Sequence, residues 1–342
     1  MRTDVVYAKS EAGADLPVID VTNPAFAVSA TDAELAAMAE QYVIEASRQQ
    51  EIPEALREAL RNSLLGRGLM AGTGTFLDGM STYLLKLGPD NLCEGATPID
   101  QRIAASFPAF TTRLRLQDVA KLLADGLASS VASDPRRPLC FVNIGGGPAS
   151  DSWNALILLR AGFSCEDRSE QEELLADREI AIAVADVDRG GPAFGARAVE
   201  ALREAAAPLS GLNIVFRHFS YEWSNVGRLR QALEELRARH GVCGISSEGG
   251  LFEYGSDEEI VSNLRELNSG TAFDAIIVGS VTRDGAPVRA SLASNRFLTR
   301  PRTIEAFQAL AEQGGWTVQK VLERPFSYNV QLVKGSDQVA QG

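Results

Sequence analysis

The chain has 342 residues, of which 45% are hydrophobic and 23% charged, and its formal net charge is −12 at pH 7. This is the composition of a globular protein with enough chain for one large domain or two. The acidic balance argues against a nucleic-acid partner, because a protein that binds phosphates presents a basic face.

We expect no secretory signal at the N-terminus. Residues 1–22 contain acids and no long apolar core, so a secretory signal is not expected. No run of the chain approaches the roughly 20 apolar residues of a membrane span, so we expect no membrane partner. The four cysteines have no CxxC spacing and are typical of reduced thiols, which predicts a cytoplasmic protein.

The first part of the chain is predicted to be helical. A capping box begins at Thr31, with Glu34 three residues later, and Pro53 stands where a first helical position would be. Apolar residues that recur close to every 3.6 residues predict a further long helix. These signals predict helices over about 31–50, 53–65, 69–87 and 107–132, after an extended arm over 1–30. We expect an all-helical lid segment, residues 1–134, and a second domain, residues 135–342.

Strands and helices alternate after residue 134, which is typical of a doubly wound parallel sheet. Strands are predicted over 139–144, 180–187, 212–219, 242–246, 275–281, 316–321 and 327–333. Helices are predicted over 194–206, 226–240, 257–267 and 302–313. The connection 322–325 is too short to hold a crossover helix, so the last two strands must be antiparallel.

Three glycines, Gly145, Gly146 and Gly147, separate the first of these strands from a helix that begins near Ser150. A strand, a glycine turn and a helix in this order place backbone N–H groups and a helix N-terminus beside a ligand. The alternative is a tight turn that binds nothing. The dinucleotide pattern G-x-G-x-x-G also fits poorly, because Ser150 holds its third position, so a nicotinamide oxidoreductase is a distant alternative.

The stretch 143–149, Asn-Ile-Gly-Gly-Gly-Pro-Ala, resembles the first motif of the class I S-adenosylmethionine (SAM) dependent methyltransferases. That motif is an acidic residue, a spacer and G-x-G-x-G. Asn143 replaces the acid and Ala149 the third glycine. The resemblance covers about residues 139–334 and includes the antiparallel end of the sheet. It implies an α/β, Rossmann-like fold, a mostly parallel seven-stranded sheet with an antiparallel C-terminal hairpin.

The resemblance also implies a SAM site. The turn from Gly145 to Gly147 would lie against the methionine and ribose of SAM. An acid at the end of the second strand would hold the ribose hydroxyls, and Asp186 is the first choice with Asp188 the second. The alternative for either acid is a turn or helix cap. The sequence separation between Gly145 and Asp186 is long for this kind of site, and we attribute the excess to an acidic insertion over 166–179.

Two further strand ends carry candidates. Phe219 and Ser220 end the third strand, which lines the adenine in this family, and Tyr221 follows them. Ser246 and Glu248 stand at the end of the fourth strand, the edge that would face the sulfonium and the acceptor. The alternatives are core packing for the rings and a capped loop for the polar residues.

These residues predict methyl transfer to a small molecule by in-line displacement at the sulfonium. No dedicated base is evident, so the acceptor is already nucleophilic or is activated by Glu248 or Tyr221. The helices before residue 134 would close over the pocket, with Phe76 and Tyr83 as lid residues. With two histidines in the chain, a multi-histidine metal site has no support, and we expect no metal. A homo-oligomer is left open.

Asn143 raises a second hypothesis. A carboxylate at this position supports the charged ammonium of SAM, and a neutral amide in an apolar pocket removes that support and lowers the pKa of the amine. The amine would then attack its own γ-carbon and release methylthioadenosine. The chain is similar in general plan to the azetidine-2-carboxylate synthases, which cyclise SAM in this way. A third hypothesis is a SAM-binding module without turnover.

Overall fold

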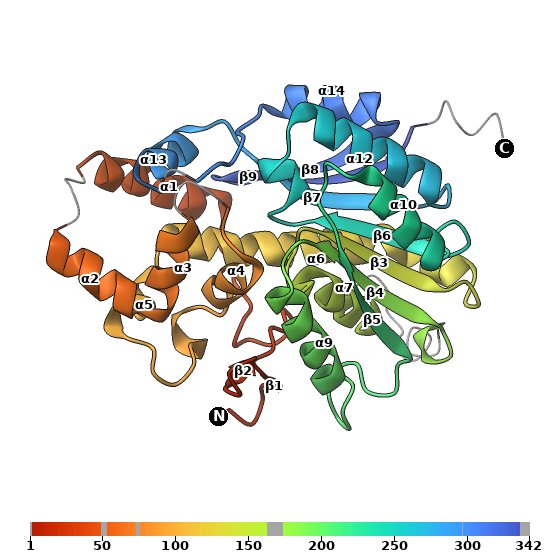
Figure 1. Cartoon of the computed structure of the whole chain (residues 1–342), viewed down its shortest axis with the longest axis horizontal. Coiled ribbons are helices and arrows are strands. Elements are labelled where there is room, and N and C mark those ends of the chain that lie inside the picture. The colour runs from red at the N-terminus through yellow and green to blue at the C-terminus, as the bar shows by residue number, and fades with distance from the viewer. Residues whose placement is uncertain (1, 49–52, 73–75, 163–173, 296, 336–342) are drawn as a thin grey trace.

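The computed structural model describes residues 2–48, 53–72, 76–162, 174–295 and 297–335 (Figure 1). Seven strands form one sheet in the order β5-β4-β3-β6-β7-β9-β8. Most of the acidic insertion expected over 166–179 lies outside the described residues. The strands are β3 (Leu139–Ile144), β4 (Ile180–Asp186), β5 (Ile214–Ser220), β6 (Val242–Ser247), β7 (Ile276–Thr282), β8 (Trp316–Glu323) and β9 (Ser327–Lys334).

Strands β3 to β7 are parallel, and β9 runs antiparallel to both β7 and β8. The strand order reverses at β3, whose neighbours β4 and β6 are reached by connections in opposite directions. Such a switch point opens a crevice at the carboxyl ends of the strands. The order confirms the Rossmann-like class I methyltransferase fold, including the antiparallel hairpin expected from the short connection before β9.

Helices cover both faces of the sheet (Figure 1). Leu139 and Phe141 of β3 are buried against one helix layer, whereas Cys140 and Val142 are buried against the other. This alternation explains why the strand is apolar at successive positions. The first layer holds α6 (Phe107–Ser133), α7 (Ser150–Arg160) and α9 (Gly190–Leu202). The second layer holds α10 (Val226–Glu235), α12 (Asp257–Gly270) and α14 (Ile304–Gln313), and two further helices are α11 (Leu251–Tyr254) and α13 (Ala286–Asn295).

The sequence predicts an all-helical N-terminal part, but the structure contains a β-hairpin there. Within the expected extended arm, β1 (Tyr7–Lys9) and β2 (Asp15–Pro17) pair as an antiparallel hairpin. Strands this short carry too few residues for a period of two to show in the sequence. The predicted capping box at Thr31 is present. The helices are α1 (Asp32–Ser47), α2 (Glu54–Asn62), α3 (Leu64–Gly72), α4 (Gly79–Lys86), η1 (Pro89–Asn91) and α5 (Pro98–Ala104).

Helix α6 belongs to the sheet rather than to a separate N-terminal body. Its residues Val119, Leu123 and Leu127 are fully buried in the same core cluster as Leu139 and Phe141 of β3. The hydrophobic core therefore continues across residue 134. Although α6 has 27 residues, neither it nor any other helix in the described ranges is long and apolar enough to cross a bilayer.

Candidate functional site

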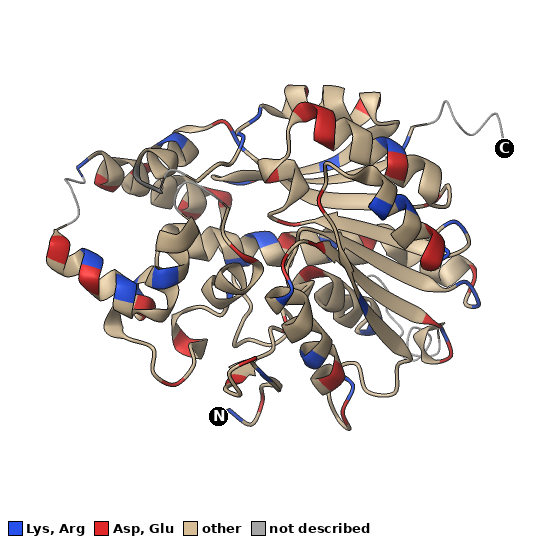
Figure 2. Ribbon diagram, in the orientation of Figure 1, with Lys and Arg blue, Asp and Glu red and all other residues tan. Residues whose placement is uncertain are grey.

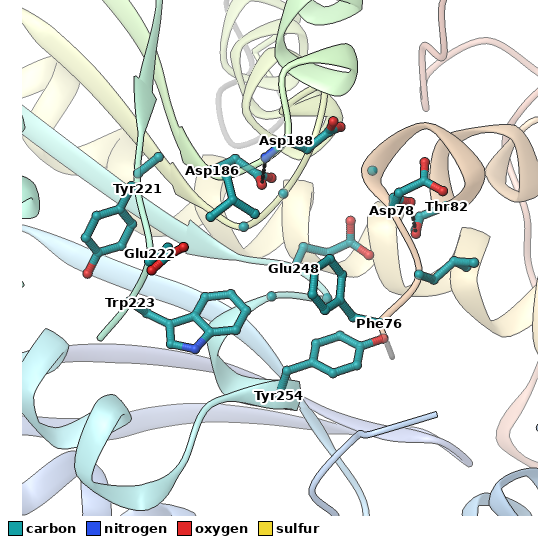
Figure 3. Close-up of a pocket in the computed structure, with 18 of the residues that line it drawn as sticks. Phe76, Asp78, Thr82, Asp186, Asp188, Tyr221, Glu222, Trp223, Glu248 and Tyr254 are labelled. Atoms are coloured by element: carbon teal, nitrogen blue, oxygen red, sulfur yellow. Dashed lines mark hydrogen bonds between the residues drawn. The ribbon is translucent and has the colours of Figure 1, made fainter. Parts of the chain in front are cut away.

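A pocket of about 330 Å³ lies at the carboxyl ends of β3, β4 and β6 (Figure 3). This volume is at the lower end of the range of about 300–1,000 Å³ found for small-molecule sites. Its wall includes strand ends, one face of α4 and three aromatic rings. Representative lining residues are Gly145, Gly146, Asp186, Glu248, Asp78, Thr82, Lys86, Phe76, Trp223 and Tyr254.

The glycine turn borders this pocket. Gly145 has a φ of +66° and Gly147 a φ of +56°, a region that favours glycine. A Cβ on Gly145 would lie 3.2 Å from the ring of Trp223, and a Cβ on Gly146 only 1.9 Å from Asn143 Oδ1. Gly145 and Gly146 line the pocket, as the strand–turn–helix pattern predicts.

Gly147 is a glycine for another reason. A Cβ there would lie 2.6 Å from the Cα of Gly79, the first residue of α4, and a Cβ on Gly191 of α9 would lie 2.8 Å from the Cα of Gly147. The third glycine of the turn therefore lets a helix from the N-terminal part lie directly on the turn. Nothing in the local sequence pattern indicates this contact, because it joins residues far apart in the chain.

Asp186 and Asp188 both line the pocket (Figure 3). Both carboxylates also accept hydrogen bonds from backbone N–H groups. Asp186 accepts hydrogen bonds from Gly147 N at 3.0 Å and from Asp188 N at 2.9 Å. Burial raises its pKa above the ordinary value. Asp188 accepts from Gly190 N and Gly191 N at the start of α9, the helix-cap role considered from the sequence.

Asn143 is fully buried behind the turn and is not part of the pocket wall. Its Nδ2 donates to Asp151 Oδ1 at 2.6 Å and to Ser246 Oγ at 3.0 Å. Asp151 stands in the first turn of α7 and is 1% exposed, and no local sequence pattern marks it as a site residue. The structure thus brings Asn143 and Ser246 together and adds a carboxylate between them.

Glu248 lines the pocket but is held in ion pairs. Its two carboxylate oxygens accept from Lys86 Nζ and from Arg115 Nε, the latter at 2.7 Å, and Arg115 also pairs with Glu253 at 2.7 Å. Burial opposes ionisation of Glu248, but the charges of Lys86 and Arg115 outweigh it and hold its pKa below the ordinary value. These contacts argue against the predicted role of Glu248 in activating an acceptor, because a carboxylate so paired is a weak base.

Tyr221 is a lining residue of the pocket, but its hydroxyl donates to Asn263 of α12. Figure 3 shows the phenol pointing away from the other labelled side chains. Burial raises its pKa, so this hydroxyl does not supply the activating group that the sequence suggested. Phe219 and Ser220 lie in an adjoining groove with Asn225 and Arg228 rather than in the wall of the main pocket.

The two aromatic residues predicted to form the lid lie in different surroundings. Tyr83 is 1% exposed, donates from its hydroxyl to Pro17 O at 2.6 Å, and packs against Phe194, so it is a core residue. Phe76 lines the pocket and meets Tyr254 edge to face, with ring centroids 6.1 Å apart. The N-terminal part reaches the pocket through Phe76 and through Asp78, Thr82 and Lys86, which lie four residues apart along α4 and so share a face.

Charge gathers around this site. Figure 2 shows acidic segments of the chain meeting between the N-terminal helices and the sheet, next to basic segments of α4 and α6. Among the described residues that line the pocket, Lys86 is the one base. The acidic lining residues are Asp78, Asp186, Asp188, Glu222 and Glu248. No group of three or more His, Cys, Asp or Glu in the described part of the chain is arranged to hold a metal ion.

Comparison with known proteins agrees with the fold. A protein from Bordetella parapertussis, described as a possible exported protein, has a TM-score of 0.54 at 18% identity; the match covers 90% of this chain and 98% of that one. The pyocyanin biosynthetic protein PhzM matches 89% of this chain and 74% of its own, at 14% identity and a TM-score of 0.42. Magnesium protoporphyrin IX methyltransferase from Synechocystis PCC 6803 with bound SAM matches 68% of this chain and 85% of its own, at 13% identity and a TM-score of 0.41.

No family model and no curated protein sequence matches the chain. At 18% identity the match to the Bordetella parapertussis protein concerns the fold alone. The strand order and its antiparallel hairpin define that fold as the Rossmann-like fold of the class I methyltransferases.

Proposed function

We propose that this protein is an enzyme that uses SAM to methylate a small molecule. The observation that carries the proposal is the pocket at the strand switch point, where the bare backbone of Gly145 and Gly146 meets the carboxylate of Asp186. The acidic lining suits a cation such as SAM, and the low volume suits a small ligand.

Asp186 is proposed to hold the ribose hydroxyls. Each of its oxygens accepts one backbone N–H, from Gly147 or Asp188, and a carboxylate has about four acceptor positions. Lone pairs therefore stay available for two hydroxyl donors. The backbone bonds fix the orientation of the carboxylate before a ligand arrives, which reduces the entropy lost on binding.

SAM supplies a methyl group already activated on a sulfonium, so the protein has to align the reactants and exclude water. Helix α4 covers the turn through the contact of Gly79 with Gly147, and the rings of Phe76, Trp223 and Tyr254 border the same space. Because Glu248 is ion-paired and the Tyr221 hydroxyl is bonded to Asn263, an acceptor that is nucleophilic without deprotonation is favoured.

The proposal is tested by calorimetry with SAM and with its demethylated product, S-adenosylhomocysteine. We expect both to bind wild-type protein, and Asp186→Ala to weaken both at least tenfold. A screen of small nucleophiles with SAM that carries an isotope-labelled methyl group then identifies the acceptor. Absence of binding would contradict the proposal. Binding without transfer to any acceptor would instead favour the SAM-binding module without turnover.

The cavity volume favours a second candidate, the cyclisation of SAM by its own amine. A cavity of about 330 Å³ has room for a single nucleoside-sized ligand, and cyclisation needs no second substrate. The neutral Asn143 also agrees with an uncharged amine, whereas the neighbouring Asp151 favours a charged one and so supports methyl transfer.

Incubation with SAM and no acceptor separates the two. Methylthioadenosine together with a cyclic amino acid would support cyclisation. Unchanged SAM, with S-adenosylhomocysteine formed only when an acceptor is added, would support methyl transfer.

A further inference from the structure

The loop between β5 and α10 forms one wall of the pocket. Tyr221, Glu222, Trp223 and Ser224 all line the pocket, although the loop has no helix or strand of its own. Strand β5 is at the edge of the described sheet, so a neighbouring strand supports the loop on one side only. Contacts outside the sheet are therefore needed to hold this wall in place.

The side chain of Trp223 lies against the glycine turn. A Cβ on Gly145 would lie 3.2 Å from Trp223 Cζ3, so the indole packs on the backbone of a residue that itself lines the pocket. Figure 3 shows Trp223 across the pocket from Asp78 and Thr82. The position of the Trp223 ring therefore determines the width of the pocket on this side.

A buried amide of α12 holds this loop. Asn263 is 0% exposed and lies in the middle of the helix. Its Nδ2 donates to Trp223 O at 2.7 Å, and its Oδ1 accepts from the Tyr221 hydroxyl. The same Nδ2 donates to Glu259 O at 2.8 Å, one turn earlier in α12, which fixes the orientation of the amide.

Neither helix formation nor core packing explains an asparagine at this position. Asparagine is a weak helix former, and a buried amide is tolerated only where it is hydrogen-bonded. The nearby buried residues Ile260, Leu264 and Leu267 of α12 are apolar, so leucine would serve the packing better. The hydrogen bonds that Asn263 makes to the loop are what distinguish it from leucine.

We propose that Asn263 is a positioning residue, which holds Trp223 against the glycine turn and so fixes the pocket wall before a ligand binds. A wall that is already ordered reduces the entropy lost on binding. Asn263 does not line the pocket itself and acts through the backbone of Trp223. The inference rests on the proposed function, because the ligand whose binding depends on this wall is SAM or S-adenosylhomocysteine.

Trp223 provides a direct readout of its own position. The chain has three tryptophans, and Trp153 and Trp316 are at most 1% exposed, whereas Trp223 is partly exposed. A small neutral quencher such as acrylamide therefore reports on Trp223, and Trp223→Phe should remove the quenchable emission. In protein without ligand we expect Asn263→Leu to increase acrylamide quenching about twofold, because the loop opens locally.

Calorimetry measures the consequence for the ligand. We expect Asn263→Leu to weaken S-adenosylhomocysteine binding about tenfold, the contribution of one hydrogen bond. Asn268→Leu is the matched control, since it makes the same change in α12 and also removes a bond to a loop carbonyl, Gly315 O at 2.7 Å. Gly315 precedes β8 and so lies at the opposite edge of the sheet. Asn268→Leu should leave quenching and affinity unchanged even where it lowers Tm.

Tyr221→Phe is a milder variant that decides the question if Asn263→Leu does not fold. It removes only the hydroxyl that donates to Asn263 and keeps the ring. We expect both measurements to change in the same direction as in Asn263→Leu, by about threefold for the affinity.

Unchanged quenching and affinity in Asn263→Leu, or in Tyr221→Phe where the first variant does not fold, would overturn the inference. Equal effects of Asn263→Leu and Asn268→Leu would overturn it as well, because they would show a general loss of stability. Wild-type protein that does not bind S-adenosylhomocysteine would remove the proposed function. The quenching of protein without ligand would then still decide whether Asn263 holds Trp223.

Discussion

Asp151 is a carboxylate that its surroundings push toward the neutral form. Burial, and then the charge of Glu248, raise its pKa from an ordinary value of 3.8 to about 6. Because the folded state binds the proton more tightly than the unfolded state, Asp151 is best tolerated at low pH. The contribution of this proton to the free energy of unfolding is therefore lost as the pH rises through about 4 to 6, and the loss is roughly 3 kcal/mol.

Asp151→Asn should therefore stabilise the protein without ligand at pH 7, by up to about 3 kcal/mol, because it removes a buried charge and keeps the shape. The free energy of unfolding in urea, measured from pH 4.5 to 7 for both proteins, should show a difference that grows with pH. Parallel curves would contradict a raised pKa at this residue.

At the scale of elements, the buried ion pairs join the N-terminal helices to the end of β6. Lys86 of α4 and Arg115 of α6 both contact Glu248, and Arg115 reaches Glu253 of α11. In sequence, Lys86 and Glu248 are 162 residues apart. The network therefore determines where α4 lies over the pocket.

Arg115→Met should lower the free energy of unfolding by about 3–5 kcal/mol, because it leaves two buried carboxylates without their shared cation. Arg57→Met, which removes an exposed ion pair with Glu54 on α2, should change it by less than about 1 kcal/mol. Chemical denaturation of both variants checks the difference. Similar small losses for the two would mean that the buried network contributes little.

Helix α4 also depends on a close backbone contact where it crosses the glycine turn. A Cβ on Gly79 would lie 2.6 Å from the Cα of Gly147, so Gly79→Ala must displace the helix. We expect a loss of about 1–3 kcal/mol in stability and weaker SAM binding. Gly227→Ala in α10, where an added Cβ finds only a 3.5 Å contact, should be neutral or stabilising. Thermal melts with and without SAM compare the two, and equal effects would argue against the close crossing.

For the whole molecule, the position of α6 decides how the chain divides. Val119, Leu123 and Leu127 share one core with β3, and the guanidinium of Arg178 donates to the carbonyls of Val131 and Asp134. The boundary expected at residue 134 therefore cuts through a continuous core. The N-terminal part lines the pocket through α4 and also packs α6 against one face of the sheet.

A fragment of residues 135–342 should accordingly fail to fold, since one face of its sheet would expose the apolar surface that α6 covers. Circular dichroism during heating should show a cooperative transition for the full chain and none for the fragment. A fragment that melts cooperatively would contradict the shared core and support two independent domains.

The sequence by itself determined the parts of this protein that depend on local pattern. Apolar runs and helix periods located the seven strands and most of the helices between them, though not α11 or α13, and the short connection before β9 required an antiparallel end to the sheet. The turn at Gly145 and the acid Asp186 could be found for the same reason, because each follows directly on a strand.

Only the tertiary structure decided which distant residues meet. No local sequence period encodes the contacts between distant elements. Such contacts join Asp151 to Asn143, Lys86 to Glu248 and Gly79 to Gly147. The tertiary structure also decides which polar groups are engaged in hydrogen bonds outside the pocket, such as the Tyr221 hydroxyl, which donates to Asn263. The physical reason is that burial and pairing set the charge and availability of a polar group, and both are properties of the packed molecule.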